Sequence, residues 1–515
     1  MAAISSCPGG ITNQGRRASF PKANMLEQLE QVRIEATTSI DLGIRSRLGQ
    51  FLTPATVARF MASLFPASNL PSARLLDAGA GIGSLTGAFL DRWAEGAFEF
   101  REVTATAYEI DDTLRGYLTK TLEGYAAQLA LTIKVLSYDF IEDSLNKIQF
   151  PTEPRFTHAI LNPPYKKIHS NSRHRRLLSQ VGIETVNIYS AFVALAVELM
   201  ETGGQIVAII PRSFCNGPYY RPFREFVLAR AAIRHIHLFE SRNKAFKDDG
   251  VLQENIIIRL ECGGQQGKVT ISTSTDDTFT DYQAHAHPFE RIVMPYDRER
   301  FVHIPTSLND SPIELSPVIR HSLADLGIEV STGPVVDFRM REHLREMPEP
   351  GTVPLLYSVH FAGLGIEWPK MGIKKPNAIM RNAYTEKWLY PTGFYVVTRR
   401  FSSKEEKRRI VANVVAPEAF PDALALGFEN HLNVFHACKK GLPEDLVRGL
   451  AVFLNSRVFD NHFRLFSGHT QVNATDLRQM KYPSHAILSS LGSWAKSRGE
   501  LTQAMIDTKI ENHIL

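Results

Sequence analysis

Short apolar runs and longer segments of helical period alternate along the first half of the chain. Seven apolar runs have the length of buried strands, and they occupy residues 73–79, 103–111, 131–140, 156–164, 203–211, 234–240 and 255–262. In the stretches between the first five, apolar residues recur every three or four positions, which predicts helices. These helices span residues 85–94, 113–129 and 191–200. Alternating strands and helices favour an α/β fold, here a doubly wound, mostly parallel, Rossmann-like sheet with helices on both faces.

The composition and periodicity of the sequence change toward both ends of the chain. Residues 1–24 are rich in Gly, Ser, Asn and Arg without periodicity, which predicts a flexible tail. Thr53 and Pro54 indicate a helix start, with Thr53 as N-cap and Pro54 as the first helical residue. After the last apolar run the alternation fades into sequence rich in Ser, Thr, Asp and Pro. We therefore place one domain at residues 25–305 and a second, of α+β type, at residues 306–515.

Composition and charge exclude several classes of protein. With 515 residues, of which 44% are hydrophobic and 22% charged, the chain is too long for one compact domain and too apolar for disorder. The net charge is only +4, so a nucleic-acid surface must be a local patch. The four cysteines form no CxxC pair and no histidine stands at ligand spacing, so we expect no disulfide scaffold and no metal. No apolar stretch reaches the ~18 residues of a membrane span, and we expect no membrane contact and a cytoplasmic location.

A glycine-rich turn follows the first predicted strand. That strand ends in Asp77, and Gly79, Gly81 and Gly83 precede the next helix. Glycines at this spacing permit a tight turn and bring backbone N–H groups close to a ligand, as in nucleotide-binding crossovers. The turn predicts a nucleotide-like cofactor.

Acidic residues end the next two predicted strands. Glu109 follows the second strand, where its carboxylate could accept from both ribose hydroxyls of an adenosine. Asp139 follows the third, where it could accept from an adenine amine, with Phe140 beside the ring. The alternative is that these carboxylates, like Asp77, only cap strand ends.

The tetrapeptide Asn162-Pro163-Pro164-Tyr165 ends the fourth predicted strand. Ligands of open sheets bind at the carboxyl ends of strands. The Asn162 side-chain oxygen and the Pro163 carbonyl can both accept from an NH₂ group, which favours a pyramidal nitrogen in the transition state. The prolines stiffen the loop, and Tyr165 offers a face on which a base can stack. The alternative is a Pro-Pro turn with a surface tyrosine.

With these motifs the sequence resembles the S-adenosylmethionine-dependent DNA adenine-N6 methyltransferases of the γ arrangement, and among them the modification methyltransferases of the PstI and BsuBI type. The resemblance covers most of residues 40–484. The matching stretches are GQFLTPATVARFMASLF, the glycine turn, YEID, SYDF, NPPY, GGQIVAIIPRSF, VLQENIIIRL and FSGHTQVNATDLRQMKYP. The resemblance implies that the cofactor is S-adenosylmethionine, that the substrate is double-stranded DNA, and that residues 306–515 recognise the target site.

The resemblance also implies roles for individual residues. Those assigned to the cofactor lie before the first helix, in the glycine turn and at strand ends. They are Thr53 and Pro54 for the methionine end, Asp77, Gly79 and Gly81 (with Gly83 of the same turn) for the amino-acid portion, Glu109 for the ribose, Asp139 and Phe140 for the adenine, and Asn162. Asn162, Pro163, Pro164 and Tyr165 would hold the target amine. Phe246, rather than Phe239, would pack on the other side of a flipped adenine.

Three polar stretches are candidates for DNA contacts. The first follows the tetrapeptide and carries Lys166, Lys167, Arg173, Arg175 and Arg176. The second carries Ser467, Gly468, His469, Gln471 and Asn473. The third, residues 398–410, mixes arginines and lysines with Phe401, Glu405 and Glu406. Their alternatives are a solvated helix start, a structural polar loop and an exposed turn, respectively.

Two rival functions follow from the same motifs. An NPPY motif also serves methyltransferases of RNA or of protein glutamine, and the chain could be a non-catalytic DNA-binding module. The roughly 200 residues after the predicted catalytic domain argue against the first, and the intact Asn162 and glycine turn argue against the second. The expected function is methylation of adenine N6 at a specific DNA site within a bacterial restriction-modification system. The sequence leaves open a separately encoded endonuclease partner and a monomeric or dimeric state.

Overall fold

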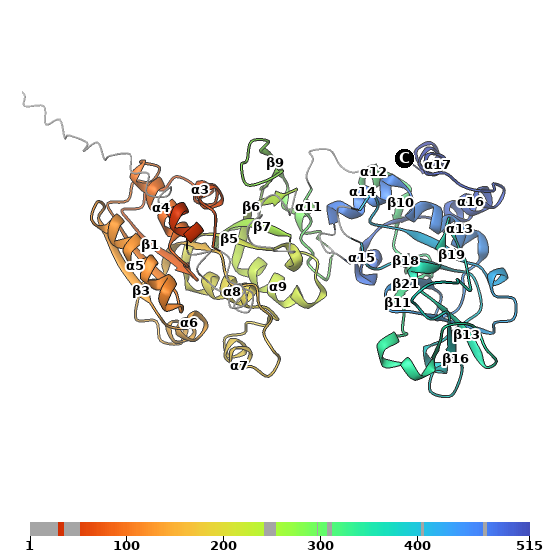
Figure 1. Cartoon of the computed structure of the whole chain (residues 1–515). Helices are drawn as coiled ribbons and strands as arrows, with labels where there is room; N and C mark the ends of the chain where they lie inside the picture. Colours follow the sequence, from red (N-terminus) through yellow and green to blue (C-terminus); the bar gives the residue numbers. More distant parts are fainter. Residues whose placement is uncertain are drawn as a thin grey trace, which may run out of the picture.

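The computed structural model describes residues 29–35, 52–240, 254–295, 297–305, 312–402, 406–466 and 471–514. It forms two parts side by side, one built on a large sheet and one on several smaller sheets (Figure 1). Several expectations lie outside the described residues. They are the tail at residues 1–24 and the roles of Phe246, Ser467, Gly468 and His469.

A nine-stranded sheet forms the first part, in the order β3-β2-β1-β4-β5-β7-β6-β8-β9. Its strands are β1 (Ser72–Ala78), β2 (Glu102–Tyr108), β3 (Leu131–Leu136), β4 (Phe156–Leu161), β5 (Met200–Pro211), β6 (Ala231–Phe239), β7 (Asn255–Cys262), β8 (Val269–Ser274) and β9 (Gln283–His287). The first five are mutually parallel, as predicted, whereas β7 runs antiparallel to β5 and β6. The carboxyl ends of β1 to β5 therefore meet at one edge of the sheet.

Helices cover both faces of this sheet. Their bounds are α3 (Ala55–Ser63), α4 (Ser84–Ala94), α5 (Asp112–Ala126), α6 (Phe140–Gln149), α7 (Arg173–Gln180), α8 (Ile188–Leu199), α9 (Arg221–Arg230) and α11 (Phe289–Ile292). Leu75 packs with α3, α4 and α5 in one core, and the next residue, Leu76, packs with α6 and α8 in another. Because successive strand residues point to opposite faces, strands such as β1, β4 and β5 supply both cores. The predicted α/β fold is confirmed.

The predicted cap of α3 is wrong. The helix begins at Ala55, its N-cap position is Pro54, and no side chain of that residue caps it. The Ala55 N–H donates instead to Glu30 Oε2 at 2.9 Å. The Thr53 hydroxyl accepts a hydrogen bond from Asn162 instead of from a backbone N–H of the helix.

The second part is α+β. Its sheets follow the orders β11-β21-β18-β19 and β12-β16-β13-β20-β17, with the pairs β10-β22 and β14-β15. The strands are β10 (Ile319–His321), β11 (Glu329–Thr332), β12 (Leu344–Arg345), β13 (Thr352–Leu356), β14 (Phe361–Ala362), β15 (Gly365–Ile366), β16 (Ala378–Met380), β17 (Tyr390–Pro391), β18 (Tyr395–Arg399), β19 (Ala412–Val415), β20 (Ala425–Phe428), β21 (Leu432–His436) and β22 (Tyr482–Pro483). The helices are α12 (Pro312–Leu315), α13 (Glu444–Leu454), α14 (Arg457–Phe466), α15 (Ala474–Gln479), α16 (His485–Lys496) and α17 (Gln503–Ile514).

Helices α13 and α16 cross at very short range. A Cβ atom on Gly449 of α13 would lie 1.7 Å from the Leu488 carbonyl oxygen, and one on Gly492 of α16 would lie 1.7 Å from the Asp445 carbonyl oxygen. No side chain fits at that distance. The crossing therefore depends on both glycines.

A buried ion pair lies where the two parts meet. Arg212 follows β5 directly, and its Nη1 lies 3.0 Å from Glu254 Oε1, with both side chains buried. Its Nη2 donates to the carbonyl oxygen of Leu465 in α14 at 3.3 Å. Arg212 thus connects the carboxyl edge of the large sheet to the second part. None of the described helices has the length and apolarity that a membrane span requires.

Candidate active site

A cleft opens at the edge where β1, β2, β3 and β4 end, and we call it the strand-end cleft. Residues from all four strand ends line it. The predicted site residues among its lining are Thr53, Gly79, Gly81, Glu109, Asp139, Phe140, Asn162 and Pro164. The structure therefore brings residues more than 100 positions apart in the sequence into one cleft. Pro54, Asp77, Gly83, Pro163 and Tyr165 do not line it.

The glycine turn forms one wall of the strand-end cleft. Gly79, Gly81 and Gly83 have φ values of 79°, 58° and 91°, a region that other residues rarely adopt. The Gly81 N–H donates to Glu109 Oε2 at 2.9 Å, and the Asp111 N–H donates to Glu109 Oε1 at 2.8 Å. Burial raises the pKa of Glu109, although these two N–H groups oppose that shift. Glu109 thus fixes the turn while it faces the cleft.

Asp77 lies behind the glycine turn in a dry environment. Its Oδ2 accepts a hydrogen bond from the Thr86 hydroxyl at 2.6 Å. Its Oδ1 is buried and has no hydrogen-bond partner within the described part of the chain. Burial raises the pKa of Asp77 to about 7. An unsatisfied buried carboxylate oxygen of this kind fits a cationic donor, such as the amino group of a ligand.

The Asp139 carboxylate already forms three hydrogen bonds within the protein, which its sequence position did not indicate. Its Oδ1 caps α6 by accepting from the N–H groups of Ile141 and Glu142, and its Oδ2 lies 3.1 Å from His174 Nε2 of α7. Burial alone would raise the pKa of Asp139, but the His174 contact and the backbone donors lower it overall. A carboxylate has about four acceptor positions, so one remains for a ligand amine.

Two exposed apolar side chains line the cleft and were missed by the sequence reasoning. Ile110 is 57% exposed and Tyr138 is 61% exposed, and each is the sequence neighbour of one of the acidic residues. Large apolar side chains that remain this exposed in a cleft are suited to cover a flat ring. Their adjacency to Glu109 and Asp139 is the sequence feature that could have identified them.

Asn162 is held in a defined orientation. Its Nδ2 donates to Thr53 Oγ1 at 2.9 Å, and the Tyr165 hydroxyl donates to its Oδ1 at 3.3 Å. The same hydroxyl lies 3.3 Å from the Ile209 carbonyl oxygen of β5. The Tyr165 ring meets Tyr189 edge-on, with centroids 6.2 Å apart. These contacts fix which end of the Asn162 amide is the acceptor.

The basic residues after Tyr165 differ in their surroundings. Lys166, Lys167, Arg173 and Arg176 are exposed, and Arg173 also forms an ion pair with Glu142 at 3.0 Å. Arg175 is half-buried, and its backbone N–H donates to the Ser172 hydroxyl at the start of α7. The structure therefore supports a helix start and an exposed basic surface at the same place.

The described part of the second polar stretch is built into the fold. Asn473 is the N-cap of α15, where it forms a capping box with Asp476. The Gln471 side chain accepts a hydrogen bond from Arg400 Nη2 at 3.3 Å. Across the described residues, no group of three or more His, Cys, Asp or Glu side chains is arranged to hold a metal ion.

The fold and the strand-end cleft define the class: an α/β protein with a ligand site at the carboxyl edge of a mostly parallel sheet. Among solved structures, the chain is similar to a cryo-EM structure of a DrdV–DNA complex, with a TM-score of 0.52 and 11% identity, over 92% of this chain and 59% of that one. It is also similar to a nuclease-deletion mutant of the type ISP enzyme LlaGI, with a TM-score of 0.50 and 10% identity, over 91% and 56%. These likenesses concern the fold.

Relatives in sequence narrow the class to a family. Residues 110–246 match the model of the Eco57I restriction-modification methylases. The chain is 53% identical to the type II methyltransferase M.BsuBI of Bacillus subtilis, over 95% of this chain and 98% of the relative. It is 42% identical to M.PstI of Providencia stuartii, over 94% and 96%. The chain belongs to the type II restriction-modification methyltransferases and is a DNA methyltransferase, which confirms the predicted resemblance.

Proposed function

We propose that this enzyme transfers the methyl group of S-adenosylmethionine to N6 of an adenine at a specific site in double-stranded DNA. The observation that carries the proposal is that Asn162, with its amide oriented by Thr53, lines the same cleft as the glycine turn and Glu109. The residues expected to bind the cofactor and the residue expected to accept from the target amine thus line the same cleft. S-adenosylmethionine, when bound, supplies an electrophilic methyl group.

The residues of the cleft, together with Asp77 buried behind the glycine turn, fit this cofactor. Asp77 Oδ1 would pair with its ammonium group, and the backbone of Gly79 and Gly81 leaves room for its amino-acid portion. Glu109 would accept from the ribose hydroxyls, and Asp139 from the adenine amine. Phe140, Ile110 and Tyr138 would provide the apolar contacts of the adenine ring.

The chain's contribution to the chemistry is the placement of hydrogen-bond acceptors. Asn162 Oδ1 and the Pro163 carbonyl would accept from the two N–H groups of the target amine. As the amine nitrogen becomes pyramidal, its N–H bonds become stronger donors, so these contacts stabilise the transition state more than the ground state. Pro164 keeps the loop rigid, and Thr53 keeps the amide from rotating.

The target adenine must leave the helix to reach this cleft. An amine inside a stacked duplex cannot approach an acceptor at the edge of a sheet, and enzymes of this kind extrude the base. Tyr165 lies directly beside Asn162 and would stack on the extruded adenine, with Phe246 as the proposed second ring. Lys166, Lys167 and Arg176 would contact the phosphates of the same strand, since they are exposed immediately beyond it.

We assign target recognition to residues 306–515 and methyl transfer to residues 25–305. We further propose that the enzyme is cytoplasmic and bacterial. A separately encoded endonuclease would cleave the same DNA site. The bacterial sources of both relatives and their type II designation support it.

Expression of the full chain in cells without adenine methylation tests the proposal. Sequencing of modified bases should reveal N6-methyladenine at one short sequence, and the Asn162→Ala variant should leave that sequence unmodified. Binding of duplex DNA by the variant serves as the control for folding. Methylated cytosine, or methylation of RNA or protein glutamine without modified DNA, would contradict the proposal.

A further inference from the structure

The basic stretch at residues 398–410 divides into a buried half and an accessible half. Arg409 is fully buried, and its backbone N–H donates to Asp460 Oδ1 at 2.7 Å. Arg408 Nη1 donates to Gln503 Oε1 at 2.6 Å. These two arginines therefore hold α14 and α17 against the sheet. The other half, Arg399 to Phe401, begins at the last residue of β18, and we call it the Arg-Arg-Phe turn.

Two clefts open on either side of the Arg-Arg-Phe turn. Arg400 lines the first, together with Ser331, Thr475 and Arg478. Arg399 and Phe401 line the second, together with Lys375 and His431. The Phe401 side chain is 43% exposed, although it is large and apolar. Hydrogen-bond donors, positive charges and a partly exposed aromatic ring, which contacts His431, are thus concentrated around three consecutive residues.

The same turn contacts the second polar stretch of the sequence, some 70 residues further on. The Val472 N–H donates to the Arg400 carbonyl oxygen at 2.6 Å, and Phe401 pairs with Gln471 as an isolated β-bridge. The Arg400 guanidinium donates to the Asn430 carbonyl oxygen at 3.2 Å and to Gln471 Oε1 at 3.3 Å. Arg400 is therefore held in place before any ligand arrives, which lowers the entropy cost of binding.

The turn also lies close to the catalytic edge. Gln471 is six residues beyond Leu465, whose carbonyl oxygen accepts from Arg212 at the end of β5. Six residues span at most ~20 Å. Helix α15, which begins at Ala474 and carries Arg478, lies on the side of the second part that faces the large sheet (Figure 1). DNA held at the strand-end cleft would pass this surface.

We propose that the Arg-Arg-Phe turn, together with Arg478, reads the target sequence of duplex DNA. The proposal rests on the proposed function. It extends that function to the stretch 398–410, for which the sequence alone favoured an exposed turn at least as strongly as a DNA contact. Arginine is the side chain that most often reads guanine, through paired hydrogen bonds in the major groove. An exposed aromatic ring packs against a base or sugar. Arg400 and Arg478 would supply the first contact, and Phe401 the second.

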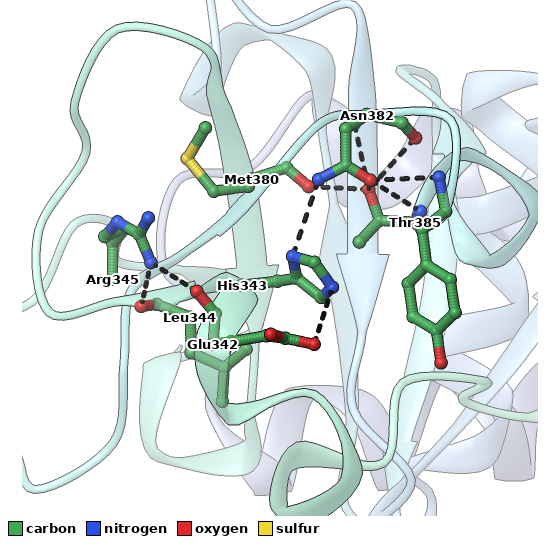
Figure 2. Close-up of polar contacts among 8 residues, drawn as sticks. Glu342, His343, Leu344, Arg345, Met380, Asn382 and Thr385 are labelled. Carbon is green, nitrogen blue, oxygen red and sulfur yellow. Dashed lines mark hydrogen bonds and ion pairs between the residues drawn. The ribbon is translucent and has the colours of Figure 1, made fainter.

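A second exposed aromatic residue in the same part of the molecule provides a matched control. Tyr384 is 53% exposed and has Lys387 Nζ 5.0 Å from its ring, so it resembles Phe401 beside Arg400. It lines neither cleft. The polar groups near Tyr384 bond to one another. Figure 2 shows His343 bonded to Asn382, and the Thr385 hydroxyl donates to the Met380 carbonyl oxygen at 2.6 Å.

The experiment uses the full chain and the duplex that its own modification pattern defines. Methyl transfer to that duplex is compared with transfer to a duplex carrying one altered base pair, for wild type and for Phe401→Ala, Arg478→Ala and Tyr384→Ala. We expect Phe401→Ala and Arg478→Ala to lower kcat/KM on the correct duplex about tenfold or more. Both variants should also reduce discrimination, measured as kcat/KM on the correct duplex divided by kcat/KM on the altered duplex. Cofactor affinity and melting temperature should not change, and Tyr384→Ala should stay within twofold of wild type.

The outcomes separate this inference from the proposed function. If wild type methylates no duplex, the proposed function fails. If wild type methylates a specific site but Phe401→Ala and Arg478→Ala keep both the rate and the ratio, the recognition surface is elsewhere. A uniform loss on both duplexes with an unchanged ratio would mean phosphate contact only, and it would also overturn the proposal.

Discussion

Thr53 Oγ1 accepts a hydrogen bond from Asn162 Nδ2 at 2.9 Å, and this contact decides which end of the Asn162 amide is its acceptor end. Thr53 is buried and lines the strand-end cleft with Asn162. Because an amide bonded through its nitrogen presents its oxygen in the opposite direction, Thr53 acts as a positioning residue for Asn162.

The Thr53→Val variant should lower kcat about tenfold or more and leave the KM for DNA nearly unchanged. Valine has almost the same shape as threonine but cannot accept from Asn162 Nδ2. The variant therefore loses this hydrogen bond, worth about 0.5–1.5 kcal/mol, and with it the constraint on the amide. Single-turnover methylation measures the effect. Thr53→Ser keeps the hydroxyl and should retain most of the rate, and equal rates for the two variants would contradict this role.

Asp77 should make the protein less stable as the pH rises from about 4 to about 7. Its pKa is raised by burial to about 7 in the folded state, so the folded protein holds a proton that the unfolded chain releases near pH 3.8. Full ionisation would cost up to roughly 4 kcal/mol. Asp77→Asn removes this contribution. Melting temperatures should therefore agree near pH 4, with the variant increasingly higher between pH 4 and pH 7, and a constant difference between them would exclude the effect.

Cofactor binding should depend on pH in the opposite direction. Pairing of Asp77 with an ammonium group requires the ionised carboxylate, so affinity for S-adenosylmethionine should rise with pH and level off above about 7. Calorimetry in buffers of different ionisation enthalpy would detect the released proton. In Asp77→Asn the affinity should be weaker and the pH dependence over this range should disappear.

Gly449→Ala should destabilise the second part of the molecule by several kcal/mol. The added methyl group would lie 1.7 Å from the Leu488 carbonyl oxygen, so α13 and α16 would have to separate. Gly116→Ala is the matched control, because Gly116 lies on the exposed face of α5 with open space around it. That variant should stabilise by about 0.5–1 kcal/mol. Chemical denaturation measures the free energy of unfolding, which should fall for Gly449→Ala and rise for Gly116→Ala.

Arg212→Met should destabilise the protein by about 3–5 kcal/mol, since it leaves the buried Glu254 without its ion-pair partner. The double variant Arg212→Met/Glu254→Leu should recover part of that loss. If the double variant is no more stable than the single one, the ion pair is not the source of the effect. Denaturant unfolding of the three proteins provides the measurement.

The sequence predicted those parts of the site that depend on local pattern. The buried strands, the glycine turn and the strand-end positions of Glu109 and Asn162 follow from periodicity and spacing. The partner of Thr53 was not predictable, because it lies 109 residues away and competes with a local capping role that the sequence favours. The pairing of Phe401 with Gln471 was hidden for the same reason, since only tertiary packing brings the two segments together.

The contact between Arg212 and Leu465 uses a backbone acceptor on the second part of the molecule. Every amino acid offers the same carbonyl oxygen, so the attachment places no demand on the side chain at position 465. The second part, to which we assign target recognition, can therefore change its sequence, or be exchanged for another of the same backbone shape, without loss of this contact. If that assignment holds, a new specificity can be grafted onto an unaltered first part.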